Sequence, residues 1–535
     1  MSSPLPPAPQ CVVSPRGELV EWAHLSRFTD TAMPDTATAT ARRPAPPDRH
    51  RMLEKLRAST TGLQVQYRLA TGETTRRIYL DSTASTLQLG IVADVVRKYL
   101  PHYANTHSDA HFNAKLSTRE FAWAHDMVVD FVGAAAGAYG CFFVGSGATG
   151  GLNRVARTLA SKWPERDVVV TTVMEHHSND LPHRKNFARV VHAPVAVTDS
   201  GFGCADVGRI EQALEQHAGR VNYVAVTGVS NVTGIVNPIH DIAELAHKHG
   251  ALLVVDAAQM AAHVPIQMSG HDNPARDLDI VCLSGHKIYA PSSPGAVVTR
   301  RDLFAGVEPD EVGGGMVDDV YLDRYLSTDQ FPDREEAGTP NIVGAIALAT
   351  SLAALKTIGM NFIAEEETAL INRAVADLAA IDDVVVYGET DTAKCKRAGA
   401  ISINIRGMHH ALTAAILNDY FNIAVRNACF CAHPYVREMI ADDLGEQMEG
   451  LTNEELEALA EMHRGMVRAS FGIYNTARDV DALADALRKI CAGKDHYRAQ
   501  YHESDCGGEY IHNTFRFDSR PVFSARDEID DWFAD

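Results

Sequence analysis

Short apolar runs that alternate with helix-like segments constrain the fold of this chain more than any other feature of its sequence. Five runs rich in β-branched residues have the length of strands, at 168–172, 223–227, 252–255, 280–283 and 296–299. Segments with helical spacing lie between them, for example 239–249. Strands that alternate with helices predict an α/β fold whose mainly parallel sheet is covered on both faces. In such a sheet, ligands bind at the carboxyl ends of the strands.

Two folded domains are expected from the distribution of these segments. The strands above belong to a large domain at 76–355, which ends in an Ala- and Leu-rich helix at 343–358. A smaller C-terminal α+β domain is predicted at 356–495. Within it we expect a strand at 400–405, a cysteine loop at 429–434 and a closing helix at 479–491.

The two ends of the chain differ in composition from these domains. An N-terminal extension at 1–75 includes a Pro/Ala/Thr-rich stretch at 31–50, which is typical of a linker. A tail at 496–535 is polar and acidic but carries several aromatic residues, and we expect it to dock on the folded body.

Charge and hydropathy narrow the range of functions. The chain has 49 Lys+Arg against 69 Asp+Glu, a net charge of −20, which argues against binding to nucleic acid. Its apolar runs are shorter than the roughly 20 residues of a transmembrane helix, so we expect no membrane span. The N-terminus has the pattern of neither a signal nor a transit peptide, which favours a cytoplasmic location. Nine scattered cysteines indicate reduced thiols rather than a disulfide scaffold.

A lysine follows one of the predicted strands. The apolar run at 280–283 continues into Ser284-Gly285-His286-Lys287 and then breaks into a loop rich in Pro and Gly. Such a lysine is either an ordinary surface residue or an amine whose pKa is lowered by partial desolvation. In the second case it can form a Schiff base with a carbonyl cofactor.

Three further features at strand ends fit the same cofactor. Asp256 closes the strand at 252–255, where a carboxylate either caps a helix or keeps the ring nitrogen of pyridoxal phosphate (PLP) protonated. The Gly-rich turn at 144–153 leads into a helix predicted from Leu152 and either binds phosphate or is merely a turn. His176 is either a core histidine or stacks on the cofactor ring. Together the four features predict a PLP site.

The order of the motifs along the chain completes this interpretation. They are YLDSTAST (79–86), FFVGSGATGGLN, EHHSNDLP, SNVTG (230–234), VDAAQ, SGHK, GGGM (313–316), EAGTPN (336–341), VRNACFCAHP (425–434) and RASFGIYNT (468–476). In these motifs the chain resembles class V aminotransferase-fold PLP enzymes of the cysteine desulfurase and selenocysteine lyase group. The resemblance implies an α/β PLP-dependent transferase of fold type I, with a mainly parallel seven-stranded sheet in the large domain.

The resemblance also implies roles for individual residues. Lys287 would form the Schiff base with PLP, Asp256 would pair with the pyridine nitrogen, and His176 would stack on the ring. The rest of the implied cofactor-binding set is Ala148, Thr149, Asn231, Gln259, Ser284 and His286, with Thr339 reaching the phosphate of a neighbouring subunit in a homodimer. The implied substrate-binding residues are Arg468, which would clamp the carboxylate, Arg426 and His107.

Cys431 stands where desulfurases carry their nucleophile. Its thiolate would attack the sulfur of bound cysteine, leaving alanine and a persulfide for a protein or small-molecule acceptor. In an aminotransferase, epimerase or C–S lyase of the same fold Cys431 would only pack, and a scaffold protein without catalysis is a further alternative. The nearby Cys429 is interpreted as a bystander, and a metal site of Cys429, Cys431 and His433 lacks a clear fourth ligand.

Three positions depart from the group's pattern. Ala428 replaces a glycine of the cysteine loop, Ser108 replaces an arginine that often follows the histidine at position 107, and Gly150 replaces an acidic residue. Because the last two changes are expected near the substrate, the choice among cysteine, selenocysteine and a larger amino acid stays open.

Overall fold

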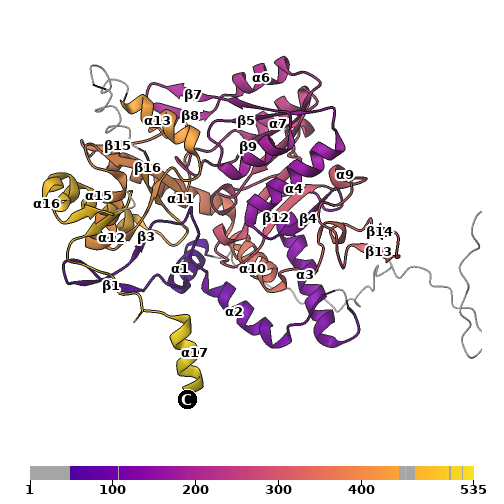
Figure 1. Cartoon of the computed structure of the whole chain (residues 1–535), viewed down its shortest axis with the longest axis horizontal. Coiled ribbons are helices and arrows are strands. Elements are labelled where there is room, and N and C mark those ends of the chain that lie inside the picture. Colours follow the sequence, from indigo (N-terminus) through magenta and orange to yellow (C-terminus); the bar gives the residue numbers. More distant parts are fainter. Residues whose placement is uncertain are drawn as a thin grey trace, which may run out of the picture. The chain divides into compact units, whose positions relative to one another are not determined.

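A computed structural model of the chain describes residues 48–106, 108–444, 452, 464–504, 508–520 and 522–534. A seven-stranded sheet lies among the large-domain residues (Figure 1). Its strands, in spatial order, are β4 (Tyr139–Val144), β12 (Gly295–Arg300), β11 (Ile280–Ser284), β10 (Leu252–Asp256), β9 (Val221–Thr227), β5 (Val168–Thr172) and β6 (Arg189–Ala193). β12 runs antiparallel to both neighbours, and the pairs from β11 to β6 are parallel. The predicted mainly parallel, seven-stranded sheet is thus confirmed.

The local predictions agree with this sheet. Strand β5 has the predicted bounds, and the other four predicted strands are one or two residues longer than the apolar runs. The helix expected at 239–249 is α7 (Ile239–Lys248). The helix expected at 343–358 is α10 (Ile342–Ile358). Apolar periodicity located these elements because each is buried.

Helices cover both faces of the large sheet. Because successive residues of a strand point to opposite sides, each strand contributes side chains to both faces. In β11, Val281 and Leu283 join a core cluster with helices on one face, whereas Ile280 and Cys282 join a second cluster on the other. The first face packs against α2 (Gly90–Tyr99), α3 (Phe112–Phe131), α6 (Val207–Gln216), α7, α8 (Met260–His263) and α10. The opposite face packs against α4 (Gly147–Lys162), α9 (Arg301–Phe304) and the residue after α5 (Leu181–Asn186).

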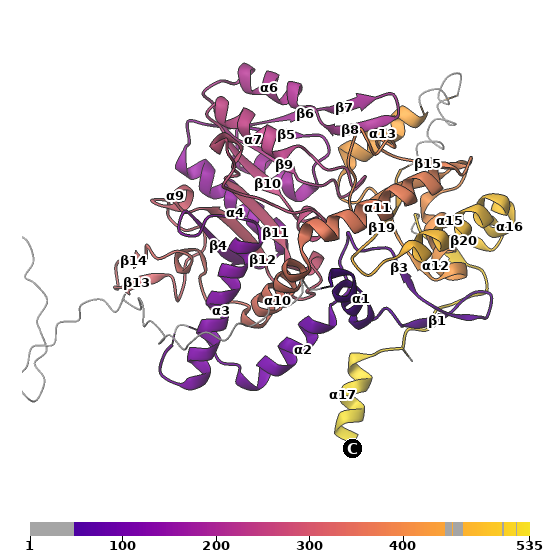
Figure 2. The ribbon, with the colours of Figure 1, turned by 180° about the vertical axis from the view of Figure 1, so that it is seen from behind.

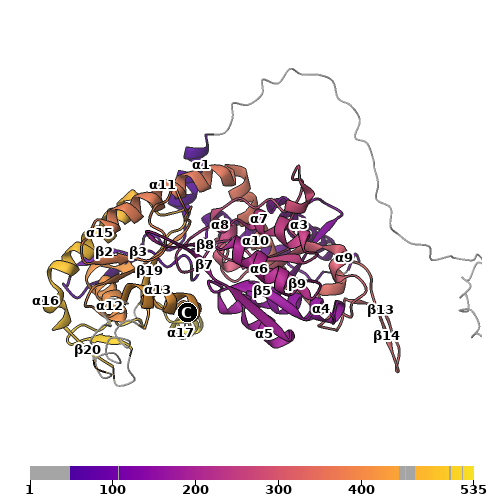
Figure 3. The same cartoon turned by 90° about the horizontal axis from the view of Figure 1, so that it is seen from above.

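A second, four-stranded antiparallel sheet lies in the C-terminal part. Its order is β15 (Val384–Val386), β16 (Ala400–Ile405), β19 (Met466–Ser470) and β18 (Arg426–Ala428). It packs with α11 (Met360–Ala379), α12 (His410–Phe421) and α15 (Ala477–Ala492). The long helix α11 runs between the regions of the two sheets (Figure 3). The predicted strand at 400–405 and helix at 479–491 are both present.

The described parts of both chain ends contact this body. Helix α1 (Arg49–Ser59) buries Leu53 in the large core cluster, and β3 (Ile78–Tyr79) pairs in parallel with β17 (Ile423–Ala424). In the sequence, the hairpin of β1 (Gln66–Arg68) and β2 (Thr74–Arg76) lies between α1 and β3. The predicted linker at 31–50 falls almost wholly outside the described residues.

In the tail, α16 (Lys494–Arg498) is followed by the hairpin of β20 (Tyr501–Glu503) and β21 (Tyr510–His512). Tyr501 joins the core of the four-stranded sheet, which confirms docking for this part of the tail. The last helix, α17 (Ala525–Ala534), buries none of its described residues, so the predicted docking of the tail is wrong for this helix (Figures 1 and 2).

Three smaller elements complete the description. β7 (Val195–Thr198) pairs with β8 (Gly201–Ala205), and β13 (Val317–Val320) pairs with β14 (Tyr325–Ser327). Helix α13 (His433–Leu444) lies beside the β7–β8 hairpin in both Figures 1 and 2. Among the helices described, none is by itself long and apolar enough to cross a membrane, although α10 and α11 pass that test as a pair bent by 81°.

Candidate active site

The carboxyl ends of neighbouring strands converge on one cavity of about 310 Å³. It brings together Lys287 after β11, Asp256 at the end of β10, and His176 after β5, as the strand-end argument predicts. Its other described lining residues are Thr83, Ala84, Ser146, Ala148, Thr149, Ser178, Thr227, Asn231, Ala258, Gln259, Ser284, His286, Arg426, Phe430, Cys431 and Arg468.

Lys287 is the last residue of a 3-10 turn, η4 (Gly285–Lys287), that directly follows β11. Burial lowers the pKa of its amine to about 8. The Asp256 carboxylate opposes this shift, the Arg468 guanidinium adds to it, and the Cys431 thiolate opposes it. A substantial fraction of the amine is therefore uncharged at neutral pH, the form that attacks a carbonyl.

Asp256 is held inside the same cavity with only 4% of its surface exposed. Its Oδ1 accepts a hydrogen bond from the backbone N–H of Ala258 at 3.0 Å. Burial raises the pKa of this carboxyl, whereas the Ala258 N–H and the Lys287 charge oppose the rise. A buried carboxylate without a full cation partner favours a positively charged ligand group beside it.

His176 presents a neutral imidazole to the cavity. Its Nδ1 accepts a hydrogen bond from the backbone N–H of Ser178 at 3.1 Å, so the ring proton of the neutral form is on Nε2. Burial and then the charge on Lys287 lower the pKa of His176 to about 3. The preceding residue, Glu175, fixes this turn by accepting hydrogen bonds from Thr172 Oγ1 and Asn179 Nδ2, both at 2.6 Å.

The Gly-rich turn forms the start of α4, and here the sequence prediction was wrong about the helix boundary. The helix begins at Gly147, five residues before the predicted Leu152, because glycine adopts the positive φ of +61° that the entry to the helix requires. Ser284 Oγ accepts a hydrogen bond from the Ala148 N–H at 2.8 Å. A Cβ on Gly147 would lie only 2.9 Å from the same Ser284 oxygen.

Hydroxyl groups surround this helix terminus. Thr149 Oγ1 lies 2.7 Å from Ser178 Oγ, and Ser146 and His286 complete this side of the cavity. The N-terminal N–H groups of a long helix, together with hydroxyl groups, favour an anion such as a phosphate group.

A buried arginine also lines the cavity. Arg468, on β19, is 3% exposed, and its Nη1 donates to the Asn231 carbonyl at 2.8 Å. Its Nη2 lies 3.5 Å from Asp81 Oδ1, and its guanidinium lies 4.7 Å from the centre of the Phe430 ring. Burial lowers the pKa of Arg468 to about 10, so it stays charged at pH 7. Its Nε is buried without a hydrogen-bond partner in the described part of the chain.

Asp81 is the counter-ion that the sequence analysis did not single out, although it lies in the motif YLDSTAST. Its Oδ2 is 3.7 Å from Arg426 Nη1, so one carboxylate faces both arginines. Two cations against one carboxylate leave a net positive charge at this end of the cavity. This arrangement fits the carboxylate of an amino acid.

The amide side chains predicted to contact the cofactor also connect segments of the chain. Asn231 Nδ2 donates to the Phe430 carbonyl, and Gln259 Nε2 donates to the Thr83 carbonyl, each at 2.8 Å. Asn231 thereby ties the large-sheet region to the loop that carries Cys431.

The two cysteines of that loop lie in different environments. Cys431 is exposed and lines the cavity, whereas Cys429 is buried and its thiol donates to the Arg464 carbonyl at 2.9 Å. Burial raises the pKa of Cys429, which keeps it in the unreactive thiol form. Phe430 and Cys431 both have positive φ, at 50° and 55°, a strained conformation that the surrounding contacts must hold.

A comparison with known proteins identifies the family. The model of the family "Aminotransferase class-V" matches residues 78–483. The chain is 32% identical to a probable cysteine desulfurase of Vibrio cholerae over 418 residues, which cover 77% of this chain and 93% of that protein. A cysteine desulfurase of Escherichia coli is also 32% identical, over 414 residues with the same coverage.

The chain belongs to the class V aminotransferase family, in its cysteine desulfurase group. Solved structures agree. The cysteine desulfurase of Thermococcus onnurineus aligns with a TM-score of 0.67 at 29% identity and covers 85% of this chain and 100% of its own. The cysteine desulfurase CsdA of E. coli aligns with a TM-score of 0.64 at 26% identity and covers 82% of this chain and 98% of its own. The α/β fold is thus that of the PLP-dependent enzymes of fold type I.

Membership of this family implies PLP, and the cavity residues of this desulfurase-group chain fit that cofactor. The Lys287 amine can bind its aldehyde, and the Asp256 carboxylate can pair with its ring nitrogen. The α4 terminus can bind its phosphate, where Gly147 leaves space that a Cβ would fill. His176 adds a neutral ring.

The structure places one predicted residue, Thr339, outside the lining of this cavity. Thr339 is exposed and lines a neighbouring cavity of about 500 Å³, which shares Ser146 and Thr149 with the first. Its hydroxyl accepts a hydrogen bond from Asn105 Nδ2 at 3.4 Å. His107 is outside the described residues.

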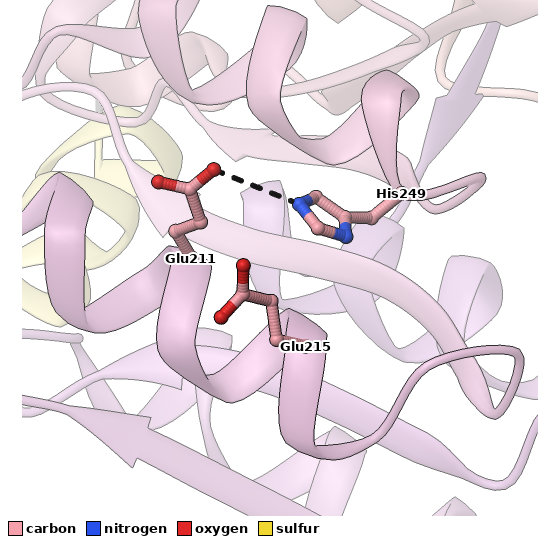
Figure 4. A group of neighbouring side chains, drawn as sticks. All are labelled: Glu211, Glu215 and His249. Atoms are coloured by element: carbon pink, nitrogen blue, oxygen red, sulfur yellow. Dashed lines mark ion pairs between the residues drawn. The ribbon is translucent and has the colours of Figure 1, made fainter.

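A cluster of two carboxylates and one imidazole lies outside the lining of this cavity. Glu211 and Glu215 on α6 face His249 (Figure 4), with ligand atoms within 4.8 Å of one another. Glu211 already pairs with the Lys248 ammonium at 2.8 Å and lies 3.8 Å from His249 Nε2. We assign this cluster to ion pairing at the surface.

Proposed function

We propose that this chain is a PLP-dependent cysteine desulfurase that converts cysteine to alanine and carries the sulfur as a persulfide on Cys431. The observation that carries this proposal is an exposed thiol on the wall of a cavity that also holds a buried amine, a buried carboxylate and a buried arginine. Neither an aminotransferase nor an epimerase needs a thiol at that position.

Each residue has a defined task in this reaction. When bound through Lys287, PLP acts as an electron sink for the amino acid. Arg468, with Arg426 beside it, binds the substrate carboxylate and so fixes the direction of the side chain. Asp256 keeps the ring nitrogen protonated. Lys287 Nζ, whose pKa is about 8, can accept and return a proton at neutral pH.

The sulfur transfer balances without an external oxidant. The Cys431 thiolate attacks the substrate sulfur, a new S–S bond forms, and the C–S bond breaks with its electron pair moving to the substrate carbon. Protonation of that carbon gives alanine, so cysteine and the enzyme thiol become alanine and the enzyme persulfide. A protein or small-molecule thiol then receives the outer sulfur atom.

The test is incubation of the PLP-loaded protein with L-cysteine, with alanine and pyruvate quantified and the persulfide mapped by mass spectrometry. We expect alanine and a persulfide on Cys431. Cys431→Ser should abolish both, whereas the matched variant Cys429→Ser should keep them, because Cys429 is buried. Pyruvate or an amino-transfer product without persulfide would move the enzyme to the lyase or aminotransferase branch. A protein that neither binds PLP nor turns over would be a scaffold.

A homodimer with a shared site is the arrangement that we propose for the enzyme. Thr339 is exposed beside the helix terminus of its own cavity, which suits a role at the phosphate of a second subunit. Thr339→Ala and Lys287→Ala would each impair the enzyme, Lys287→Ala completely. Mixed dimers of the two variants should regain one complete site if Thr339 acts on its neighbour, and none if it acts within its own subunit.

A further inference from the structure

Two histidines join the cysteine loop to the turn that carries His176. His433, the first residue of α13, follows Cys431 by two positions, and His177 begins the 3-10 turn η2 (His177–Asn179). His433 Nδ1 lies 3.0 Å from His177 Nε2, and the two rings are nearly parallel, with an interplanar angle of 8°. The backbone N–H of His177 also donates to the Cys431 carbonyl at 2.7 Å.

The loop needs such contacts to keep its shape. Phe430 and Cys431 both have the left-handed φ that side chains rarely adopt, and this conformation persists only where the surroundings impose it. Three successive backbone carbonyls of the loop accept hydrogen bonds. The Cys429 carbonyl accepts from the Ala432 N–H, and the Phe430 carbonyl accepts from Asn231 Nδ2. The Cys431 carbonyl accepts from the His177 N–H. Two of the three donors come from the large-sheet region.

Whether two imidazole rings can form a hydrogen bond depends on how many protons their ring nitrogens carry. Exactly one of the two facing nitrogens must carry a hydrogen, which is possible when both rings are neutral or when one is protonated. When both rings are protonated, two N–H groups face each other and two like charges lie side by side. The contact between His177 and His433 is then repulsive.

The charged groups around His177 determine the pH at which its ring becomes protonated beside a charged His433. His177 is half-buried, and burial followed by the charge of His433 lowers its pKa. Asp180 opposes this shift and Arg184 adds to it, but Arg184 and His192 already pair with Asp180, at 2.7 and 2.8 Å. The ring of His176 is 6.3 Å away. Beside a charged His433, the pKa of His177 therefore lies below that of an ordinary histidine.

We propose that His177 and His433 form a proton-dependent clasp that positions Cys431 over the cavity, closed at neutral pH and open when both rings are protonated. The two histidines are positioning residues. The inference rests on the proposed function, because it matters for turnover only if Cys431 is the nucleophile.

The test compares His433→Asn with His433→Ala in the full-length, PLP-loaded protein. Asparagine places an amide group near the position of Nδ1, so it keeps the hydrogen bond to His177 but does not titrate. His496→Ala, at an exposed histidine of α16, is the matched control. The first readout is hydrogen exchange of the segment 428–436, corrected for the intrinsic effect of pH, with the core strand β11 as a check on global unfolding. The second is the single-turnover rate of persulfide formation.

In the wild type and the control we expect protection of this segment at pH 7 and its loss toward pH 5. His433→Asn should stay protected at both values, and His433→Ala should exchange about tenfold faster at both, the size expected for loss of one hydrogen bond. Protection of His433→Ala equal to the wild type, or a pH step that survives in His433→Asn, would overturn the clasp. If exchange follows the expected pattern but no persulfide forms in any protein, the clasp stands and the assignment of Cys431 fails.

Discussion

The pKa of Lys287 makes a quantitative prediction about how the enzyme takes up PLP. Only the uncharged amine attacks the cofactor aldehyde. With a pKa of about 8, about a tenth of the amine is uncharged at pH 7 and about nine tenths at pH 9. For an ordinary lysine with a pKa of about 10.4 the uncharged fraction at pH 7 is only about one part in 2,500. Burial thus raises the reactive fraction at neutral pH by about 200-fold.

The assay is rapid mixing of the cofactor-free enzyme with PLP at a series of pH values, followed by the absorbance change on attachment. We expect the attachment rate to rise about tenfold from pH 7 to pH 9 and then level off, whereas an unperturbed amine would give a rise of about 100-fold without a plateau. A free alkylamine measured in parallel corrects for the titration of PLP itself. Absence of a plateau up to pH 10 would refute the reasoning.

Variants at the neighbouring charges test the cause of the shift. The Asp256 carboxylate raises the pKa of Lys287 by stabilising the ammonium, so Asp256→Asn should move the midpoint to lower pH. Cys431→Ser should move it in the same direction, because the thiolate also stabilises the ammonium. An upward movement of the midpoint in either variant would contradict these assignments.

Three further predictions concern the frame of the site. Gly295→Ala places a Cβ 2.4 Å from the backbone of Gly147, so it should lower the free energy of unfolding in urea by about 1–3 kcal/mol and weaken PLP binding. Gly314→Ala, with open space around its Cβ, is the control and should do neither. Burial raises the pKa of Glu175 to about 8, so between pH 4.5 and 8 the folded state holds a proton on Glu175 that the unfolded state has lost. The free energy of unfolding should therefore fall as the pH rises through this range. Glu175→Gln should remove this fall when the free energy is measured by urea unfolding at a series of pH values. Arg468→Lys should raise KM for cysteine about tenfold or more because the planar fork is lost, and an unchanged KM would remove Arg468 from the carboxylate site.

The core of the fold and of the site could be predicted because both follow from local patterns. Buried strands of such a sheet are nearly continuous apolar runs, so the parallel strands β5, β9, β10 and β11 and the antiparallel strand β12 are visible in the sequence. The residues at the carboxyl end of each parallel strand, or within a few positions after it, lie at the ligand-binding edge of the sheet. For that reason Lys287, Asp256 and His176 could be expected in one cavity before any coordinates.

Contacts between distant segments were beyond this reasoning. Asp81 faces Arg468 and Arg426 across more than 340 positions of sequence, and no local pattern marks it as their counter-ion. The same holds for the contact between His177 and His433, which are 256 positions apart. The start of α4 was misplaced because the positive φ of Gly147 depends on its close approach to Ser284.

The amino-acid sequence by itself determined the parallel α/β sheet, the residues at its strand ends and the family to which the chain belongs. Hydrophobic periodicity and motif order are local properties, so they survive in the sequence. Only the tertiary structure decided which of the two loop thiols faces the cavity, how far the pKa values of Lys287 and His176 fall, and what holds the strained loop at Cys431. Those properties depend on burial and on charges brought together by folding, and their magnitude depends on distances that the order of residues does not contain.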